Sequence, residues 1–184
     1  MTARTITTAR LLLRPPTNQD AQAIYDGYAR DHDVARYVLW TPHRSITDTH
    51  AFLDHFICDE QDERSFPWVM IRDADGVLIG AMHLRVEPPR ADFGFNIARP
   101  YWNQGYGTES VRGVIAFAFS IPGVERVQAV CHVDNGASAR TMEKAGMVCE
   151  GRLRRYMRFP NIGDEAQDVF LYAVTRTEHS PLGG

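Results

Sequence analysis

The chain has 184 residues, of which 44% are hydrophobic and 23% are charged, and its formal net charge at pH 7 is −3. These values are ordinary for one soluble globular domain, and the small negative charge argues against a nucleic-acid-binding protein. No apolar run reaches the roughly 18 residues of a membrane span, and residues 1–5 lack the apolar core of a signal peptide.

The expected organisation is a single domain over residues 1–178 with a loose tail over residues 179–184. The three cysteines, Cys58, Cys131 and Cys149, are widely separated, which is typical of a protein from a reducing cytoplasm. The seven histidines show no metal-ligand spacing, so no metal site is expected. Neither a membrane nor a nucleic acid is an expected partner, and the sequence leaves a homodimer open.

The N-terminal part predicts one strand and two helices. Residues 6–14 read as the strand, and a pair of prolines ends it because proline lacks the N–H that a strand ladder uses. The spacing Thr17-x-x-Asp20 resembles a capping box and begins the first helix. The second helix begins at Ser45, after a connector over residues 31–40 that contains a short helical turn.

Three consecutive strands are predicted next, over residues 66–72, 77–87 and 91–97. The first two are joined by a hairpin turn in which Gly76 supplies the backbone conformation with positive φ. The three strands therefore form an antiparallel meander.

The following stretch, residues 97–109, reads as the end of a strand, a glycine-containing turn and the start of a helix. Gly105 and Gly107 let the backbone approach a bulky group closely, and the first N–H groups of a helix have no partner within the helix. Together with the positive end of the helix dipole, these groups form either an anion site, whose usual ligand is phosphate, or a purely structural turn. The spacing matches neither the dinucleotide fingerprint nor the nucleoside-triphosphate loop.

After this helix, an apolar strand over residues 124–133 is expected to lie parallel to the strand over residues 91–97 through a right-handed crossover. The remaining predicted elements are a helix and two strands, over residues 135–146, 148–156 and 168–175. Ligands of α/β sheets bind at the carboxyl ends of such parallel strands. The glycine turn and the turn at Asn135 are therefore expected to share one site.

Several motifs resemble the GNAT superfamily of N-acetyltransferases, and within it the RimJ/RimL-type branch. The resemblance runs from Leu11 to Ala173. The motifs that carry it are Trp40-x-Pro42-His43, Tyr101-Trp102-Asn103-Gln104-Gly105-Tyr106-Gly107-Thr108-Glu109, Asn135-x-x-Ser138, Glu143-Lys144-Ala145-Gly146-Met147, Glu150-Gly151 and Asp168-x-x-x-Tyr172-Ala173. The resemblance implies an α+β fold with a mostly antiparallel sheet of about seven strands, a central parallel strand pair and about four flanking helices.

The resemblance also implies acetyl-CoA as the acyl donor. The donor's pyrophosphate would lie on the N–H groups of the glycine turn, contributed by Gln104, Gly105, Tyr106, Gly107 and Thr108. Its pantetheine arm would pair like an added strand with Phe95 and Ile97, and Asn135 would reach the end of that arm or a bound water. Two positions depart from the family pattern. Trp102 replaces a glutamine or arginine, as is usual in this branch, and Met142 replaces the tyrosine that protonates the thiolate in many relatives.

Acyl transfer to an amine needs a neutral amine, a hydrogen bond to the developing oxyanion and a proton for the departing thiolate. The resemblance implies that the Ser138 hydroxyl serves the sulfur of the departing thiolate. The alternative role of this hydroxyl is to satisfy a free N–H at the start of a helix. The backbone N–H near Ile97 is the natural oxyanion donor. Asp92 is the candidate base, acting through a water, and its alternative role is that of a solvated acid at a strand start. Asn135 completes the candidate catalytic set.

Because an aspartate of ordinary pKa, about 3.9, is a weak base, the sequence favours α-amines (pKa about 8) over lysine side chains (about 10.4), which cost about 3 kcal/mol more to deprotonate. The prediction is direct attack of a protein or peptide N-terminus on acetyl-CoA in a ternary complex. The alternatives are a small amine (a polyamine, an amino acid or an amine antibiotic) and a non-catalytic acyl-CoA sensor. Tyr37, Trp40 and His43 are expected to shape the acceptor pocket, and the arginines of residues 152–158 form either a solvated face or an anion contact.

Overall fold

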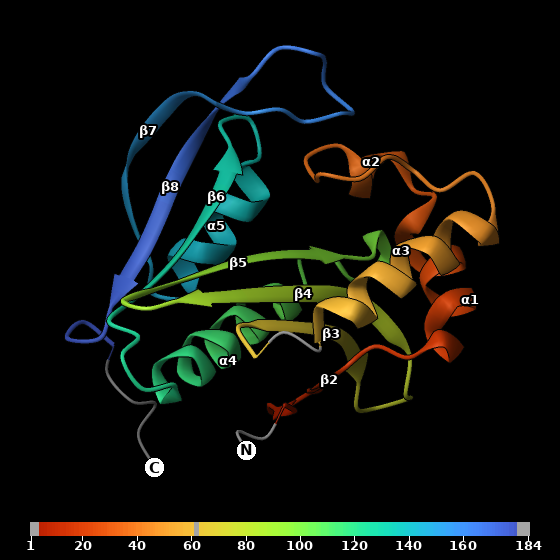
Figure 1. Cartoon of the computed structure of the whole chain (residues 1–184), viewed down its shortest axis with the longest axis horizontal. Helices are drawn as coiled ribbons and strands as arrows, with labels where there is room; N and C mark the ends of the chain where they lie inside the picture. The colour runs from red at the N-terminus through yellow and green to blue at the C-terminus, as the bar shows by residue number, and fades with distance from the viewer. Residues whose placement is uncertain (1–3, 61–62, 180–184) are drawn as a thin grey trace.

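The computed structural model describes residues 4–60 and 63–179, which form one mixed β-sheet with helices on both faces (Figure 1). Within these residues the sheet has eight strands in the order β1-β2-β3-β4-β5-β6-β8-β7. The strands are β1 (Ile6–Thr7), β2 (Leu11–Arg14), β3 (Ser65–Arg72), β4 (Leu78–Glu87), β5 (Arg90–Ile97), β6 (Arg126–His132), β7 (Val148–Met157) and β8 (Gln167–Thr175). The α-helices of the same residues are α1 (Ala21–Ile24), α2 (His32–Ala35), α3 (Ile46–Glu60), α4 (Tyr106–Ser120) and α5 (Gly136–Lys144). The predicted α+β fold is confirmed.

The N-terminal strand differs from the prediction. The expected strand over residues 6–14 is a hairpin of β1 and β2, in which Ile6 pairs with Leu13. Thr8 makes the turn, because its N–H donates to the Leu11 carbonyl (2.9 Å) and its hydroxyl accepts from the Leu11 N–H (3.1 Å). A threonine hydroxyl can compete in this way for nearby backbone groups. Because the segment is mainly apolar, its sequence indicated one continuous strand instead.

Carboxylates hold both predicted helix starts. The Thr17 N–H donates to Asp20 (2.7 Å), after which a 3₁₀ turn, α1 and a π-helical turn (Tyr25–Ala29) form the first helical segment. Asp48 accepts from the N–H groups of Arg44 (2.8 Å) and Ser45 (3.2 Å) at the start of α3. The predicted turn in the connector is α2.

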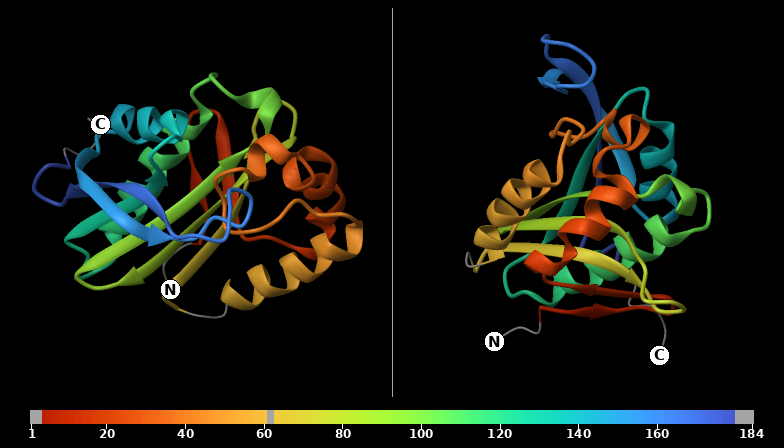
Figure 2. Two further views of the ribbon diagram at one scale, coloured as in Figure 1. Left: turned by 90° about the horizontal axis from the view of Figure 1, so that it is seen from above. Right: turned by 90° about the vertical axis from the view of Figure 1, so that its right-hand side faces the viewer.

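Two apolar cores lie on opposite faces of the sheet (Figure 2). On one face α4 packs against β4, β5 and β6 through an apolar stripe of Val111, Val114, Ile115, Ala118 and Phe119. On the other face α1 and α3 pack against β3 and β4 through Ile24 and Leu53, which are fully buried. The sheet therefore separates two layers of helices.

The central strand pair positions the site. The predicted antiparallel meander of β3, β4 and β5 is confirmed, and β6 returns parallel to β5 as predicted. However, β5 and β6 pair only from Arg90–Arg126 to Asp92–Gln128. Beyond this point β5 stays paired with β4 and β6 stays paired with β8, so the two strands diverge and the sheet opens at their carboxyl ends (Figure 1).

At the C-terminal end of the chain, β8 lies between β6 and β7, which leaves β7 at the edge of the sheet. His179 packs on Phe119, with ring centroids 5.0 Å apart, and its N–H donates to the Thr175 carbonyl (3.0 Å). The rest of the expected loose tail, residues 180–184, lies outside the described residues. Among the described helices, none combines the length and apolar character that a membrane crossing requires.

Candidate active site

The gap between β5 and β6 holds a cavity of about 1120 Å³. On the α4 side its lining includes residues from the glycine turn and from α5, namely Gly105, Gly107, Thr108, Asn135 and Ser138. On the α3 side it includes residues from the connector, α3 and β4, namely Trp40, Phe52, Phe56, His83 and Arg85. Because both groups line one cavity, the opening passes from one face of the sheet to the other.

The glycine turn has the geometry of an anion site. Gly105 precedes α4 with φ of 84°, a conformation that glycine adopts without strain. The first hydrogen bond of the helix runs from the Glu109 N–H to the Gly105 carbonyl (3.0 Å), so the N–H groups of Tyr106, Gly107 and Thr108 precede the helical ladder. These groups, with the positive end of α4, are suited to a phosphate.

Gly107 lies where α4 packs closely against α5. A Cβ atom at this position would lie 3.2 Å from the Thr141 Cγ2 and 3.7 Å from the Phe95 ring. The absence of a side chain therefore keeps the helix start against the mouth of the cavity. Of the residues predicted to bind the donor, Gln104 and Tyr106 do not line the cavity: Gln104 is exposed and Tyr106 is buried beneath the turn.

The edge of β5 that faces the gap offers unpaired backbone groups. The Ala98 N–H donates to the Ile79 carbonyl (2.7 Å), so alternate residues, including Phe95 and Ile97, direct their backbone groups away from β4. Since β6 leaves β5 after Asp92, these groups face the cavity. The Ile97 carbonyl accepts from the Trp102 indole N–H (2.6 Å), a contact that the sequence did not predict.

The turn between β6 and α5 holds Asn135 and Ser138. The Asn135 Oδ1 accepts from the Ser138 N–H (3.1 Å), which confirms Asn135 as the N-cap. Ser138 is half-buried and contacts Cys131, whose pKa is raised to about 11 mainly by burial. That thiol therefore stays protonated at neutral pH, and Met142 beside it is fully buried and brings no phenol to the cavity.

Asp92 lies at the closed end of the gap. Asp92 pairs with Gln128 of β6 in the last residue pair of the parallel ladder. On its other side it pairs with Arg85 of β4. Its carboxylate accepts from the Gln128 amide (2.6 Å) and from Arg90 (3.2 Å). The side chain is 46% exposed and lines the cavity, so water reaches it.

The outer wall on the α3 side is built by two loops that the sequence did not connect. Asn161, in the loop between β7 and β8, donates to the carbonyls of Ala35 (2.6 Å) and Trp40 (2.8 Å). Next to this contact, the buried His132 ring stacks on Tyr37 (5.1 Å between centroids) and meets Phe159 edge-on (5.3 Å). No spacing in the sequence relates these segments, because only the fold brings them together.

Of the three residues expected to shape the acceptor pocket, Tyr37 and Trp40 line the cavity. His43 stands behind Trp40, with ring centroids 5.5 Å apart, and its Nδ1 is hydrogen-bonded to the hydroxyl of buried Thr49 (2.9 Å). Burial lowers the pKa of His43. Its contribution to the pocket is therefore indirect.

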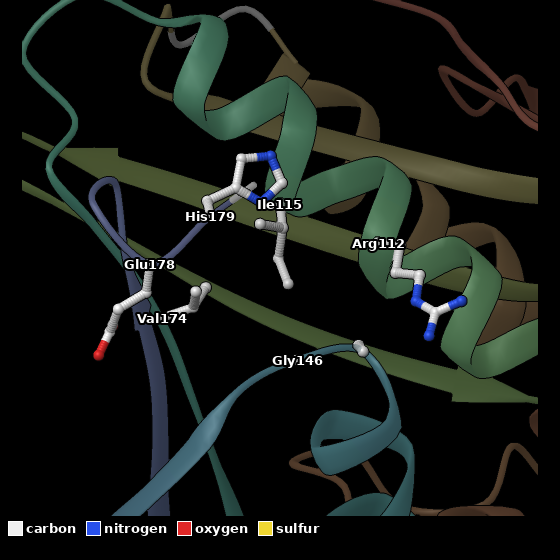
Figure 3. A pocket seen from close by; sticks show the side chains of 7 residues that line it. Arg112, Ile115, Gly146, Val174, Glu178 and His179 are labelled. Carbon is white, nitrogen blue, oxygen red and sulfur yellow. The ribbon is translucent and has the colours of Figure 1, made fainter. Parts of the chain in front are cut away.

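The arginine-rich strand β7 is largely engaged in local ion pairs. Arg152 pairs with Asp168 (2.6 Å) and Arg155 with Glu165 (2.8 Å). None of the four arginines of residues 152–158 lines the cavity. A second hollow of about 140 Å³ lies between α4, the turn after α5 and the end of β8, where Arg112 and His179 contribute to its lining (Figure 3). This hollow contains none of the predicted site residues.

Comparisons with known proteins agree with this architecture. The profile of the acetyltransferase (GNAT) domain family matches residues 10–148. The chain is 35% identical over 153 residues to the uncharacterized N-acetyltransferase YoaA of Bacillus subtilis (strain 168), an alignment that covers 82% of this chain and 86% of YoaA.

Two solved structures share the fold. Mycobacterium smegmatis RimJ in complex with CoA-disulfide superposes with a TM-score of 0.83 at 21% identity, over 95% of this chain and 88% of RimJ. The self-immunity acetyltransferase MccE, in complex with acetyl-CoA and AMP, superposes with a TM-score of 0.80 at 18% identity, over 91% of this chain and 93% of MccE. Because the family profile matches most of the chain and YoaA is 35% identical to it, the chain belongs to the GNAT family of N-acetyltransferases.

Proposed function

We propose that the protein transfers the acetyl group of acetyl-CoA to a primary amine, preferentially the α-amine of a peptide or protein N-terminus. The observation that carries this proposal is the continuous cavity through the gap between β5 and β6. A donor held by the glycine turn on one face can meet an acceptor that enters from the other face. The complexes of MccE with acetyl-CoA and of RimJ with CoA-disulfide support the choice of donor.

The residues of the cavity fit the parts of this donor. Its diphosphate would be held by the N–H groups of Tyr106, Gly107 and Thr108. Arg140 and Lys144 line the same cavity and add positive charge on the α5 side. The exposed edge of β5 would pair with the amides of the pantetheine arm through the backbone groups of Phe95 and through the second lone pair of the Ile97 carbonyl, which also accepts from Trp102.

The chain's own groups then support the chemistry that the thioester makes possible. The Ile97 N–H would donate a hydrogen bond to the oxyanion that forms as the amine attacks. The Ser138 hydroxyl would donate a hydrogen bond to the departing thiolate, which is enough because a thiol has a pKa of about 8.5 and its anion leaves without being protonated first. Asp92 would receive the ammonium proton through a water, from its position at the closed end of the gap.

The proposed preference for α-amines follows from the lower pKa of an α-amine compared with a lysine side chain. Asp92 is partly exposed, so the site has weak means of deprotonating a cation. An N-terminal amine, with a pKa of about 8, is already partly neutral at physiological pH, whereas a lysine side chain at about 10.4 is not. The aromatic wall of Tyr37, Trp40 and Phe52 is suited to the first residue of a peptide.

Thiol release from acetyl-CoA tests the proposal, with a panel of short peptides, their N-terminally blocked forms, polyamines, amino acids and amine antibiotics. We expect turnover with free peptide N-termini and loss of turnover when the terminus is blocked. Turnover with small amines alone would contradict the choice of acceptor. Binding of CoA without turnover of any acceptor would favour a sensor, and failure of CoA to raise the melting temperature would refute the donor.

A further inference from the structure

The turn between β1 and β2 contacts the glycine turn, although about a hundred residues separate the two in the sequence. Glu109, in the first turn of α4, accepts three hydrogen bonds from this hairpin: from the Thr8 hydroxyl (2.6 Å), the Arg10 N–H (2.7 Å) and the Arg10 Nε (2.7 Å). Gly113 lets the hairpin approach, since a Cβ atom there would lie 3.2 Å from both Ile6 and Thr8 side chains.

Arg10 also contacts the glycine turn itself. Its Nη1 donates to the Gln104 carbonyl (3.1 Å), its guanidinium lies 4.4 Å from the centre of the Tyr106 ring, and its Nη2 would lie 3.3 Å from a Cβ atom on Gly105. One side chain therefore touches three consecutive residues of the turn and the carboxylate behind them.

The charges in this arrangement have a functional consequence. Burial would raise the pKa of Glu109, but the hydrogen bonds from Thr8 and Arg10 and the Arg10 charge lower it overall, so the carboxylate is ionised. An uncompensated carboxylate in the first turn of α4 would occupy the positive end of the helix and repel a phosphate. Arg10 balances this charge while remaining 46% exposed.

We infer that Arg10, held by Glu109 and Thr8, is a positioning residue that shapes the glycine turn and neutralises Glu109, so that the first N–H groups of α4 remain available to the diphosphate of the donor. This inference rests on the proposed use of acetyl-CoA. It assigns to the N-terminal hairpin a part in donor binding, although the hairpin lies outside the cavity.

The test compares CoA with pantetheine, which lacks the diphosphate, by calorimetry on wild type and variants. Arg10→Met should weaken CoA binding about tenfold, equivalent to about 1.4 kcal/mol, and leave pantetheine binding unchanged within about twofold. Thr8→Val should weaken CoA binding in the same selective way but less, and it guards against misfolding of the first variant. Because the second change in Arg10→Met/Glu109→Gln removes the unpaired carboxylate, this double variant should recover part of the loss.

Arg30→Met is the matched control, because Arg30 also lies over a tyrosine ring (Tyr25, 5.4 Å) and near an acid (Asp26, 3.8 Å) but does not touch the site. It should bind both ligands as wild type does. Equal losses for CoA and pantetheine, or unchanged CoA binding in Arg10→Met, would overturn this inference and leave the proposed function standing. No recovery in the double variant would overturn the neutralising role. Wild type that binds neither ligand would overturn the proposed function together with this inference.

Discussion

Single residues at the site draw their partners from distant parts of the chain. Ser138 is an exception, because its N–H is capped by Asn135, three residues before it (3.1 Å). Asp92 is tied to β6 by Gln128 and to its own strand by Arg90, so its orientation is set by the first pairs of the β5–β6 ladder.

Replacement of Ser138 by alanine should lower kcat for acetyl transfer about tenfold or more, because the thiolate then leaves without the hydrogen bond from the Ser138 hydroxyl. The rate of thiol release at saturating donor and acceptor measures this. Ser120→Ala serves as control, since Ser120 carries its hydroxyl at the far end of α4, bonded to the Phe117 carbonyl (2.6 Å). An unchanged kcat for Ser138→Ala would remove the proposed role.

Replacement of Asp92 by asparagine should lower kcat/KM for the amine about tenfold at pH 7 and alter the pH–rate profile, because the group that receives the ammonium proton is lost. Steady-state rates from pH 5.5 to 9 measure both effects. Glu87→Gln is the matched control, since Glu87 is the other acidic partner of Arg90 (3.1 Å) and does not line the cavity. A profile identical to that of wild type would clear Asp92 as a base.

At the level of secondary-structure elements, the site depends on how closely neighbouring strands and helices approach. Gly80 on β4 and Gly94 on β5 look alike in the sequence, but the register gives them different surroundings. A Cβ atom on Gly80 would lie 2.3 Å from the Asn96 carbonyl oxygen, a backbone atom that cannot move away. A Cβ atom on Gly94 would meet nothing within 4 Å, because Gly94 lines the cavity.

We therefore expect Gly80→Ala to lower the free energy of unfolding by about 2 kcal/mol through overpacking. Gly94→Ala should change it by less than about 0.5 kcal/mol. Gly94→Ala should instead raise KM for the acceptor, because the new methyl group enters the cavity on the α3 side. Urea unfolding and acceptor titrations measure the two effects. The reverse ranking of the two stabilities would show that the strand register is wrong.

For the whole molecule, His43 couples pH to stability. Burial lowers the pKa of His43, with Asp48 opposing the shift in part. The unfolded chain therefore binds more protons at this position once the pH falls below the ordinary value of about 6.5, and stability falls with pH until the folded pKa is passed. The stability that the neutral ring contributes is fully present above that window.

Substitution His43→Asn should accordingly be more destabilising at pH 7.5 than at pH 5, because the wild type alone carries the cost of keeping the ring neutral in acid. Melting temperatures of both proteins across this range measure the gap. His50→Asn, at an exposed position on α3, is the control. A constant gap for His43→Asn would contradict the role assigned to its burial.

The elements that carry the candidate donor site were predictable because their signals are local. The glycine turn, the cap at Asn135 and the parallel return of β6 each depend on residues within one turn or one crossover, and the structure confirms these elements. The same local reading failed at residues 6–14, where a threonine hydroxyl breaks an apolar run into a hairpin.

The sequence by itself therefore determined the order of the elements and the position of the glycine turn, since helix caps, turn glycines and hydrophobic periodicity act over a few residues, and the resemblance of its motifs indicated the family and its fold. Only the tertiary structure decided the long-range contacts: the Arg10–Glu109 contact at the glycine turn, the Asn161 contacts that close the α3 side, and the neighbours of Gly80 and Gly94. Contacts between residues far apart in the sequence form only once the strands have paired. No short motif encodes them, and such contacts close the α3 side of the cavity.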